Sequence, residues 1–328
     1  MKERLEETFR MVVMLLGYAL LSAMAGLAAA IPTASSQGRA AELEARQDRR
    51  CGAEFNRSCP EGQCCSSGGA PICQIDFGPA CDANIRPKGP DTKTIARPKV
   101  GNVPYGKGVY TCNTTGVVAL TFDDGPWENT EYLLDLLAQY DAKATFFVVG
   151  RNMGKGAMND PATPWPTLIR RMINDGHQIG SHTWSHQKLT EITAAQFQNQ
   201  MIFNEIALAD LLGYFPTYMR PPHSMSDATT DTWLADLGYH VTYFDLNTLG
   251  YENDDATLIQ KSKNIWDRRV EPLDPASASV LHIEHDPLYQ TVHNLTEHIL
   301  QSMVRNDFRA VAVGECLGDP RENWYRKV

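Results

Sequence analysis

The segment Thr121-Phe122-Asp123-Asp124-Gly125-Pro126 places two adjacent carboxylates at the end of an apolar run. That run, Val117 to Leu120, predicts a buried strand, which ends at Gly125-Pro126 because glycine and proline favour turns. Two carboxylates at a strand end are costly unless a nearby cation takes up their charge. The segment therefore predicts a cation site at the end of a strand.

Short apolar runs alternate with amphipathic stretches from Val109 onward. Repeated strand–helix units favour parallel strands, and seven strands in about 200 residues predict an irregular α/β barrel rather than an open sheet. The predicted strands are Val117 to Phe122, Ala144 to Val149, His177 to Ser181, Thr217 to Arg220, His240 to Asp245, Val280 to Glu284 and Arg309 to Val313.

Polar residues of the kinds found in active sites follow or close these predicted strands. They are Asp123, Asp124, His182, His186, Arg220, Asp245, Asn247 and His285. Each of them alone has an ordinary structural explanation; Asp-Asp-Gly-Pro, for example, is a common turn sequence. In a barrel of parallel strands, however, these positions converge on one face. The sequence therefore predicts one shared site.

His182 and His186 are spaced so that a single turn of the chain can direct both imidazoles to one point. One carboxylate added to them gives a His₂Asp site with open positions, which suits zinc, with iron as the competing metal. Bound zinc lowers the pKa of its water to about 7. If Asp124 is the ligand, Asp123 remains free to take a proton from that water.

The composition sets limits on the partners and on the number of domains. The chain has 328 residues, 43% of them hydrophobic, and a net charge of −9. This length accommodates one domain of about 200 to 250 residues and a smaller module. The negative charge, without a basic run, disfavours nucleic acid as a partner. We expect a monomer.

The first thirty residues have the pattern of a secretory signal, with an apolar stretch from Met11 to Ala30 that ends in small residues. Cleavage near Ala30 predicts a secreted protein, extracellular or in a cell wall. A retained membrane anchor is the alternative, because twenty apolar residues can also span a bilayer. The triplets that begin at Asn56, Asn113 and Asn294 fit glycan acceptors.

Six of the eight cysteines, from Cys51 to Cys81, fall within 31 residues. This clustering favours a disulfide framework over a zinc site, because the paired C-x-x-C spacing is absent. We assign residues 51–82 to this module, the proline-containing residues 83–108 to a linker, and residues 109–318 to the large domain. A bridge between Cys112 and Cys316 would close a long loop around that domain.

Four motifs of the large domain resemble those of the polysaccharide deacetylases (NodB homology, carbohydrate esterase family 4), most closely fungal chitin deacetylases. They are Thr121 to Pro126, Ser181 to His186, Arg220-Pro221-Pro222 and Ile283 to Asp286. The resemblance implies a distorted (β/α)7 barrel and a divalent metal, usually zinc, with Co²⁺ or another divalent ion also possible. It also implies hydrolysis of N-acetyl groups in GlcNAc polymers.

The resemblance implies a role for each matching position. Asp123 matches the general base, and Arg220 matches the arginine that holds it. Asp124, His182 and His186 match the metal ligands, and His285 matches the general acid. The backbone N–H after Pro222 would stabilise the oxyanion.

Two positions depart from the family pattern. His223 stands where the family usually has tyrosine, which puts a side-chain contact to the substrate in doubt. Asn247 aligns with the aspartate that orients the catalytic histidine, and Asp245 is a possible substitute on the same face of the strand. His282 is the rival to His285 as the acid.

The cysteine module resembles a hevein-like (family 18) chitin-binding module, with a purely structural knot as the alternative. We expect the substrate to be chitin or a chitooligosaccharide. Peptidoglycan and acetylated xylan are alternatives within the same fold. An inactive chitin-binding wall or effector protein is the alternative from a different class.

Overall fold

The computed structural model describes residues 63–65, 73–75 and 82–328. The predicted signal peptide lies outside these residues, and so does most of the cysteine module. Within the module, β1 (Gln63–Cys65) and β2 (Cys73–Ile75) pair antiparallel. In the described residues, no helix is long and apolar enough to cross a bilayer.

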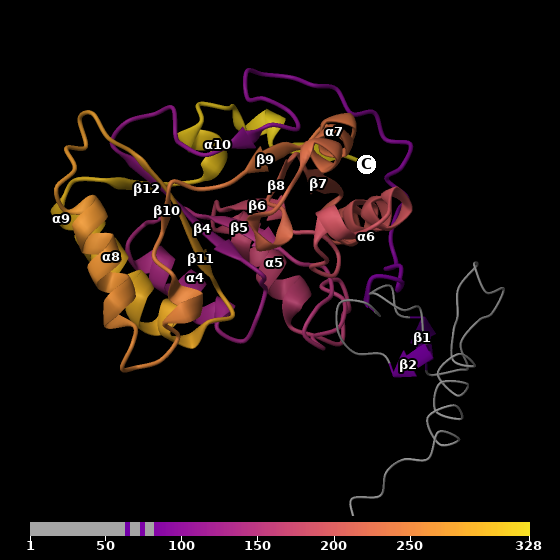
Figure 1. The fold of residues 1–328 in the computed structure, drawn as a ribbon, viewed down its shortest axis with the longest axis horizontal. Helices are drawn as coiled ribbons and strands as arrows, with labels where there is room; N and C mark the ends of the chain where they lie inside the picture. The colour runs from indigo at the N-terminus through magenta and orange to yellow at the C-terminus, as the bar shows by residue number, and fades with distance from the viewer. Residues whose placement is uncertain (1–62, 66–72, 76–81) are drawn as a thin grey trace, which may run out of the picture. The chain divides into compact units, whose positions relative to one another are not determined.

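The large domain is built on one curled sheet whose strand pairs are all parallel (Figure 1). The strand order is β10-β11-β4-β5-β6-β8-β9-β3, with β12 also paired to β4. The bounds are β3 (Gly108–Val109), β4 (Val117–Asp123), β5 (Thr145–Val148), β6 (Gln178–Ser181), β8 (Tyr218–Met219), β9 (His240–Thr242), β10 (Leu246–Asn247), β11 (Val280–His285) and β12 (Arg309–Val311). This arrangement confirms the distorted barrel.

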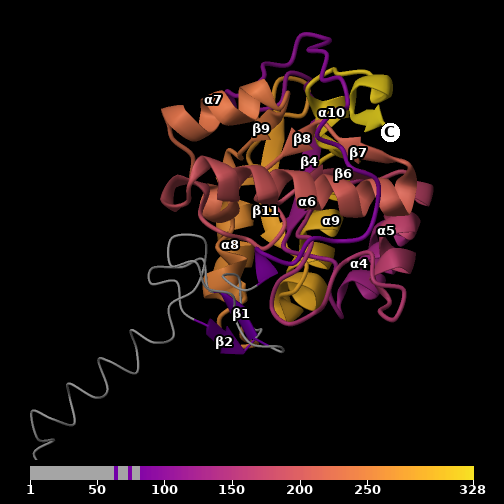
Figure 2. The same ribbon diagram turned by 90° about the vertical axis from the view of Figure 1, so that its right-hand side faces the viewer.

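Helices lie around the outside of these strands in both views (Figures 1 and 2). They are α4 (Thr130–Gln139), α5 (Trp165–Asn174), α6 (Ala194–Leu212), α7 (Ala228–Asp236), α8 (Gln260–Val270), α9 (Thr296–Arg305) and the short α10 (Val313–Cys316). In α5 the buried side chains Trp165, Leu168, Ile169 and Met172 recur every three or four residues, which gives the helix one apolar face for the sheet. The resulting core lies between strands and helices.

Short helical turns supply several loops of the barrel. They are η2 (Leu189–Glu191), η3 (Pro222–Ser224), η4 (Gly250–Glu252), the π-helical η5 (Thr291–Leu295) and η6 (Arg321–Asn323). The turns η3, η4 and η5 each follow a strand of the sheet, namely β8, β10 and β11. They therefore lie at the edge where the sequence predicted the site.

Residues 83–108, whose composition predicted a linker, pack on the barrel together with Asp82 at the end of the predicted module. Arg97 forms an ion pair with the buried Glu205 of α6 at 2.7 Å, and Thr92 donates a hydrogen bond to the same carboxylate. The indole of Trp184 donates to the backbone oxygen of Asp82. These partners lie far along the chain, so local composition could not indicate them.

The large domain also extends beyond the predicted boundary at residue 318. The strand β13 (Tyr325–Lys327) pairs antiparallel with β7 (Tyr214–Pro216). The predicted disulfide between Cys112 and Cys316 is present, across a sequence separation of 204. In the chain-entropy model a loop of that length stabilises the folded state by roughly 5 kcal/mol.

Candidate active site

Most of the predicted site residues line one cavity of about 480 Å³ at the carboxyl ends of the strands, whereas Arg220, Pro222 and Asp245 do not line it. Its lining includes Asp123, Asp124, His182, His186, His223, Asn247 and His285, together with Met153, Phe244 and Tyr251. The carboxyl ends of parallel strands meet at one edge of the sheet, which is why residues more than 150 positions apart line the same cavity.

The two adjacent aspartates occupy different environments. Asp123 is the last residue of β4 and is 2% exposed. Asp124 follows it with a φ of 76°, a left-handed conformation that aspartate tolerates better than most residues. This change in backbone direction turns the second carboxylate away from the first and toward the histidines.

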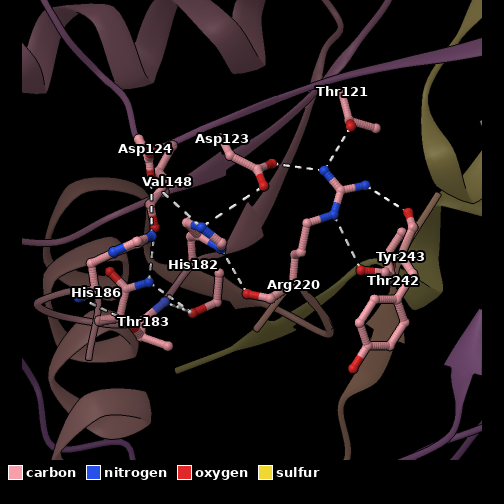
Figure 3. A network of polar contacts seen from close by, with 12 residues as sticks. Thr121, Asp123, Asp124, Val148, His182, Thr183, His186, Arg220, Thr242 and Tyr243 are labelled. Atoms are coloured by element: carbon pink, nitrogen blue, oxygen red, sulfur yellow. Dashed lines mark hydrogen bonds and ion pairs between the residues drawn. The ribbon is translucent and has the colours of Figure 1, made fainter. Parts of the chain in front are cut away.

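Asp124, His182 and His186 bring three potential ligand atoms within 4.8 Å of one another (Figure 3). The Oδ1 atom of Asp124 lies 3.1 Å from His186 Nε2 and 3.5 Å from His182 Nε2. That oxygen is buried and, in the described part of the chain, accepts no hydrogen bond of good geometry. A buried oxygen facing two imidazole nitrogens fits a divalent cation of the zinc type.

The surroundings of His182 keep its metal-facing nitrogen free of a proton. Its Nδ1 lies 2.7 Å from the backbone oxygen of Arg220, so Nδ1 carries the proton and donates it. Burial lowers the pKa of His182 to about 4. A neutral imidazole with its Nε2 lone pair exposed is the form that binds metal.

The charges of His186 and Asp124 stabilise each other in the absence of a metal ion. Burial by itself raises the pKa of Asp124, but the neighbouring imidazoles of His186 and His182 lower it further, so the net shift is downward. Burial by itself lowers the pKa of His186, and Asp124 more than offsets this, so the net shift is upward.

Arg220 fixes the Asp123 carboxylate. The guanidinium is fully buried and donates to Asp123 Oδ1 at 2.7 Å and to Thr121 Oγ1 at 2.7 Å (Figure 3). It also lies over the ring of Phe147. The other carboxylate oxygen, Oδ2, lies 3.8 Å from His182 Nε2. Asp123 therefore presents one oxygen to the metal-binding residues while the other is held by a permanent cation.

His285 faces Asp123 across the neighbouring strand. The two residues are register partners in β11 and β4, so their side chains leave the sheet on the same face. The ring of His285 packs against Tyr251, and in the described residues its buried Nδ1 has no hydrogen-bond partner. His282, the rival acid, is buried beside Trp266, bonds to Thr248 and does not line the cavity.

Neither residue predicted to orient His285 forms a hydrogen bond with it. Asn247 lines the cavity, but its Oδ1 accepts from the backbone N–H of Leu249. Asp245 accepts from the backbone N–H of Leu281, which lies four residues before His285 in β11, or roughly 13 Å along the strand. That separation is too large for Asp245 to orient the imidazole.

His223 lies at the mouth of the cavity. It is exposed, has a φ of 58° within η3, and its ring centroid is 4.7 Å from that of His186. Pro222 is buried and holds the turn. The side chain that replaces the family's tyrosine therefore lies directly beside a candidate metal ligand.

The sequence did not indicate a buried support beneath the metal-binding loop. Lys155 donates to the backbone oxygens of Asp124, Gly125 and Pro126 at 3.4, 3.1 and 3.4 Å. Asp286 is fully buried and accepts a hydrogen bond from Thr130. Burial lowers the pKa of Lys155 and raises that of Asp286. Because Lys155 donates to backbone oxygens, it requires no particular side chain as its partner, and the sequence contains no pattern that would reveal the contact.

Comparison with known proteins agrees with this geometry. The family model for polysaccharide deacetylases matches residues 111–242. A chitin deacetylase of Pestalotiopsis sp is 39% identical over 238 residues, covering 73% of this chain and 76% of that protein. A probable peptidoglycan-N-acetylglucosamine deacetylase of Arthroderma benhamiae is 38% identical over 225 residues, covering 68% of this chain and 49% of that protein.

A solved structure extends the similarity to the fold. The chitin deacetylase of Colletotrichum lindemuthianum superposes with a TM-score of 0.64 at 39% identity, covering 68% of this chain and 97% of that one. A chitin deacetylase sequence from the same fungus is 40% identical over 224 residues, which is 88% of its length. With this identity and coverage, together with the matching fold, the chain belongs to the polysaccharide deacetylase family.

Proposed function

We propose that this protein is a secreted, metal-dependent hydrolase that removes N-acetyl groups from GlcNAc residues of chitin or chitooligosaccharides. The observation that carries the proposal is the meeting of Asp124, His182 and His186 beside the Arg220-held carboxylate of Asp123. The choice of chitin is supported by relatives from Pestalotiopsis and Colletotrichum, which are named chitin deacetylases.

Asp124, His182 and His186 would hold the metal. A divalent ion there, zinc by its ligand set, would supply Lewis acidity toward the acetamide carbonyl and would make a nearby water more acidic. Asp123 accepts the proton of the attacking water at Oδ2, since Arg220 occupies Oδ1. His285, on the adjacent strand, donates a proton to the departing nitrogen. The backbone N–H of His223, after Pro222, is the proposed donor to the oxyanion.

The test is acetate release by the zinc-loaded protein from chitopentaose, acetylxylan and peptidoglycan. We expect release from chitopentaose, and loss of it in Asp123→Asn and Asp124→Ala. Asp124→Ala should also lose zinc, measured by elemental analysis. Asp245→Asn is the matched control, because Asp245 bonds Leu281 outside the cavity and should leave turnover unchanged. Zinc held stoichiometrically by Asp124→Ala would contradict the ligand assignment.

A different class of function is favoured by one observation. His285 Nδ1 has no partner in the described residues, and the position expected to orient it carries Asn247. A barrel with an unsupported acid could serve as a chitin-binding wall protein without turnover. Absence of acetate from every substrate, with retention on insoluble chitin, would establish that alternative.

The cysteine module and the leader complete the proposal. We propose that residues 51–82 bind chitin as a hevein-like module, and that the leader is cleaved near Ala30 on the way to the cell exterior. Phe55 and Phe77 are the aromatic residues of the module available for sugar stacking. Replacing both with alanine in the full chain should weaken retention on chitin, and N-terminal sequencing of the exported protein locates the cleavage.

A further inference from the structure

Three tyrosines near the cavity leave much of their rings in solvent. Tyr251 is 50% exposed, Tyr289 is 56% exposed and Tyr132 is 42% exposed. His293 lies between the last two, with ring centroids 4.2 Å from Tyr289 and 4.1 Å from Tyr132. The histidine therefore fixes two tyrosine rings that are not buried in the core.

The order of the strands places the segments that carry these rings side by side. Tyr251 belongs to η4 after β10, Tyr289 follows β11, and Tyr132 lies in the first turn of α4 after β4. Since β10, β11 and β4 are consecutive in the parallel sheet, the three segments after them are neighbours at the same edge. Asp254 also accepts a hydrogen bond from the backbone N–H of Gln290, which ties the first segment to the second.

This row of rings begins inside the proposed active site. Tyr251 lines the cavity and packs against His285. Pro287 and Leu288 also line it, and Tyr289 is the next residue. The rings therefore continue outward from the reaction centre along the edge of the sheet, past β11 and toward α4.

We propose that Tyr251, Tyr289 and Tyr132 form an aromatic track that binds further sugar units of a GlcNAc polymer outside the cavity. The identity of the sugar rests on the proposed function. Tyrosine rings offer rigid apolar faces with a polar tip, which suits sugar rings that are apolar on one face and hydroxylated at the edges. An uncharged polymer needs no charged groups along such a track.

The test compares chitobiose with chitohexaose for Tyr289→Ala, Tyr132→Ala and the unaltered zinc-loaded chain. We expect KM for the hexamer to rise about 3- to 10-fold in both variants, as the loss of one ring contact implies, with kcat and the dimer's KM unchanged. Tyr289→Phe keeps the ring and should keep the hexamer's KM. If these tyrosines have a purely structural role, the variants should change KM for both substrates equally or for neither. Either result would refute the proposed track.

The control variant is Tyr110→Ala. Tyr110 is 55% exposed and stacks on Tyr243 at 4.8 Å, but it lines a different cavity. Tyr110→Ala should leave both KM values unchanged. If it raises KM for the hexamer as much as Tyr289→Ala does, the proposed track is refuted.

If the unaltered chain releases no acetate, the proposed function fails, but the track can still be tested by calorimetric titration with chitohexaose. Weaker binding by Tyr289→Ala supports the track, whereas equal binding refutes it.

Discussion

The replacement of Arg220 by methionine tests how the base is held. Arg220 is fully buried and donates to Asp123 and Thr121, and also to the backbone oxygens of Thr242 at 3.2 Å and Tyr243 at 2.7 Å. Methionine has a similar length but donates none of these bonds. The variant would leave the buried Asp123 carboxylate without its cation.

Breaking a buried ion pair by removing one partner costs about 3–5 kcal/mol. For a domain of this size each 1 kcal/mol shifts Tm by about 2–4 °C, so Arg220→Met should lower Tm by roughly 6–20 °C. Part of that cost is the uncompensated charge of Asp123. Adding Asp123→Asn to Arg220→Met should therefore recover about 1–3 kcal/mol rather than destabilise the protein further.

Urea unfolding of the two single variants and the double variant measures the coupling energy, with and without a chelator. Arg97→Met is the matched control. It also removes a cation from a buried carboxylate, that of Glu205, but this pair lies outside the cavity. Both arginine variants should lose stability, whereas only Arg220→Met should lose turnover. Additive effects of the Asp123 and Arg220 changes, or normal kcat in Arg220→Met, would refute this reasoning.

Three further changes test other parts of the site and the fold. Lys155→Met should weaken zinc binding about 10- to 100-fold, because the Asp124 loop loses its supporting bonds; unchanged affinity in a competition assay with a chelator would contradict this. Asn247→Asp should extend activity to higher pH, because a carboxylate stabilises the protonated form of His285; an unmoved basic limb of the pH–rate profile would show that the two do not interact. Burial lowers the pKa of His177 to about 4, so the unfolded chain binds more protons below pH 6.5, and the fold loses roughly 3 kcal/mol between pH 6.5 and 4. His177→Gln should reduce the acid-dependent loss by about that amount in urea unfolding at the two pH values, while the loss due to the buried His182 and His282 remains; an acid dependence identical to that of the unaltered chain would contradict the assignment.

The barrel could be predicted because the sequence patterns that indicate its strands are short and local. Most of the predicted strands are short apolar runs, and each predicted segment corresponds to a strand of the main sheet. The two-residue strands β3 and β10 and the packed segment after Asp82 were missed, because their partners are distant. Arg97, for example, is ordered by Glu205, 108 positions away, and composition alone reads such a segment as a linker.

The site residues that directly follow strands could be predicted, because the carboxyl ends of parallel strands meet at one edge of the sheet. Asp124 and the two histidines lie at the ends of β4 and β6, and parallel strands bring such residues together regardless of sequence distance. Lys155 was missed, and Asp286 was noted only as the last residue of the fourth motif, for a physical reason. One binds backbone oxygens and the other a single threonine, so neither interaction imposes a detectable pairing of side-chain types.

The place of Asn247 in the cavity could be predicted from the sequence, but its effect on His285 could not. The alignment with the family places it beside the acid, and it does line the cavity. Its one side-chain oxygen accepts from the backbone N–H of Leu249, whereas an aspartate there would add a second, charged oxygen that could face the imidazole. The replacement therefore removes a negative charge and one of the two side-chain oxygens. Because His285 Nδ1 finds no hydrogen-bond partner in the described residues, the protein can offset the charge of the protonated acid only through nearby carboxylates such as Asp124 and Glu284, and not through an orienting hydrogen bond at that nitrogen.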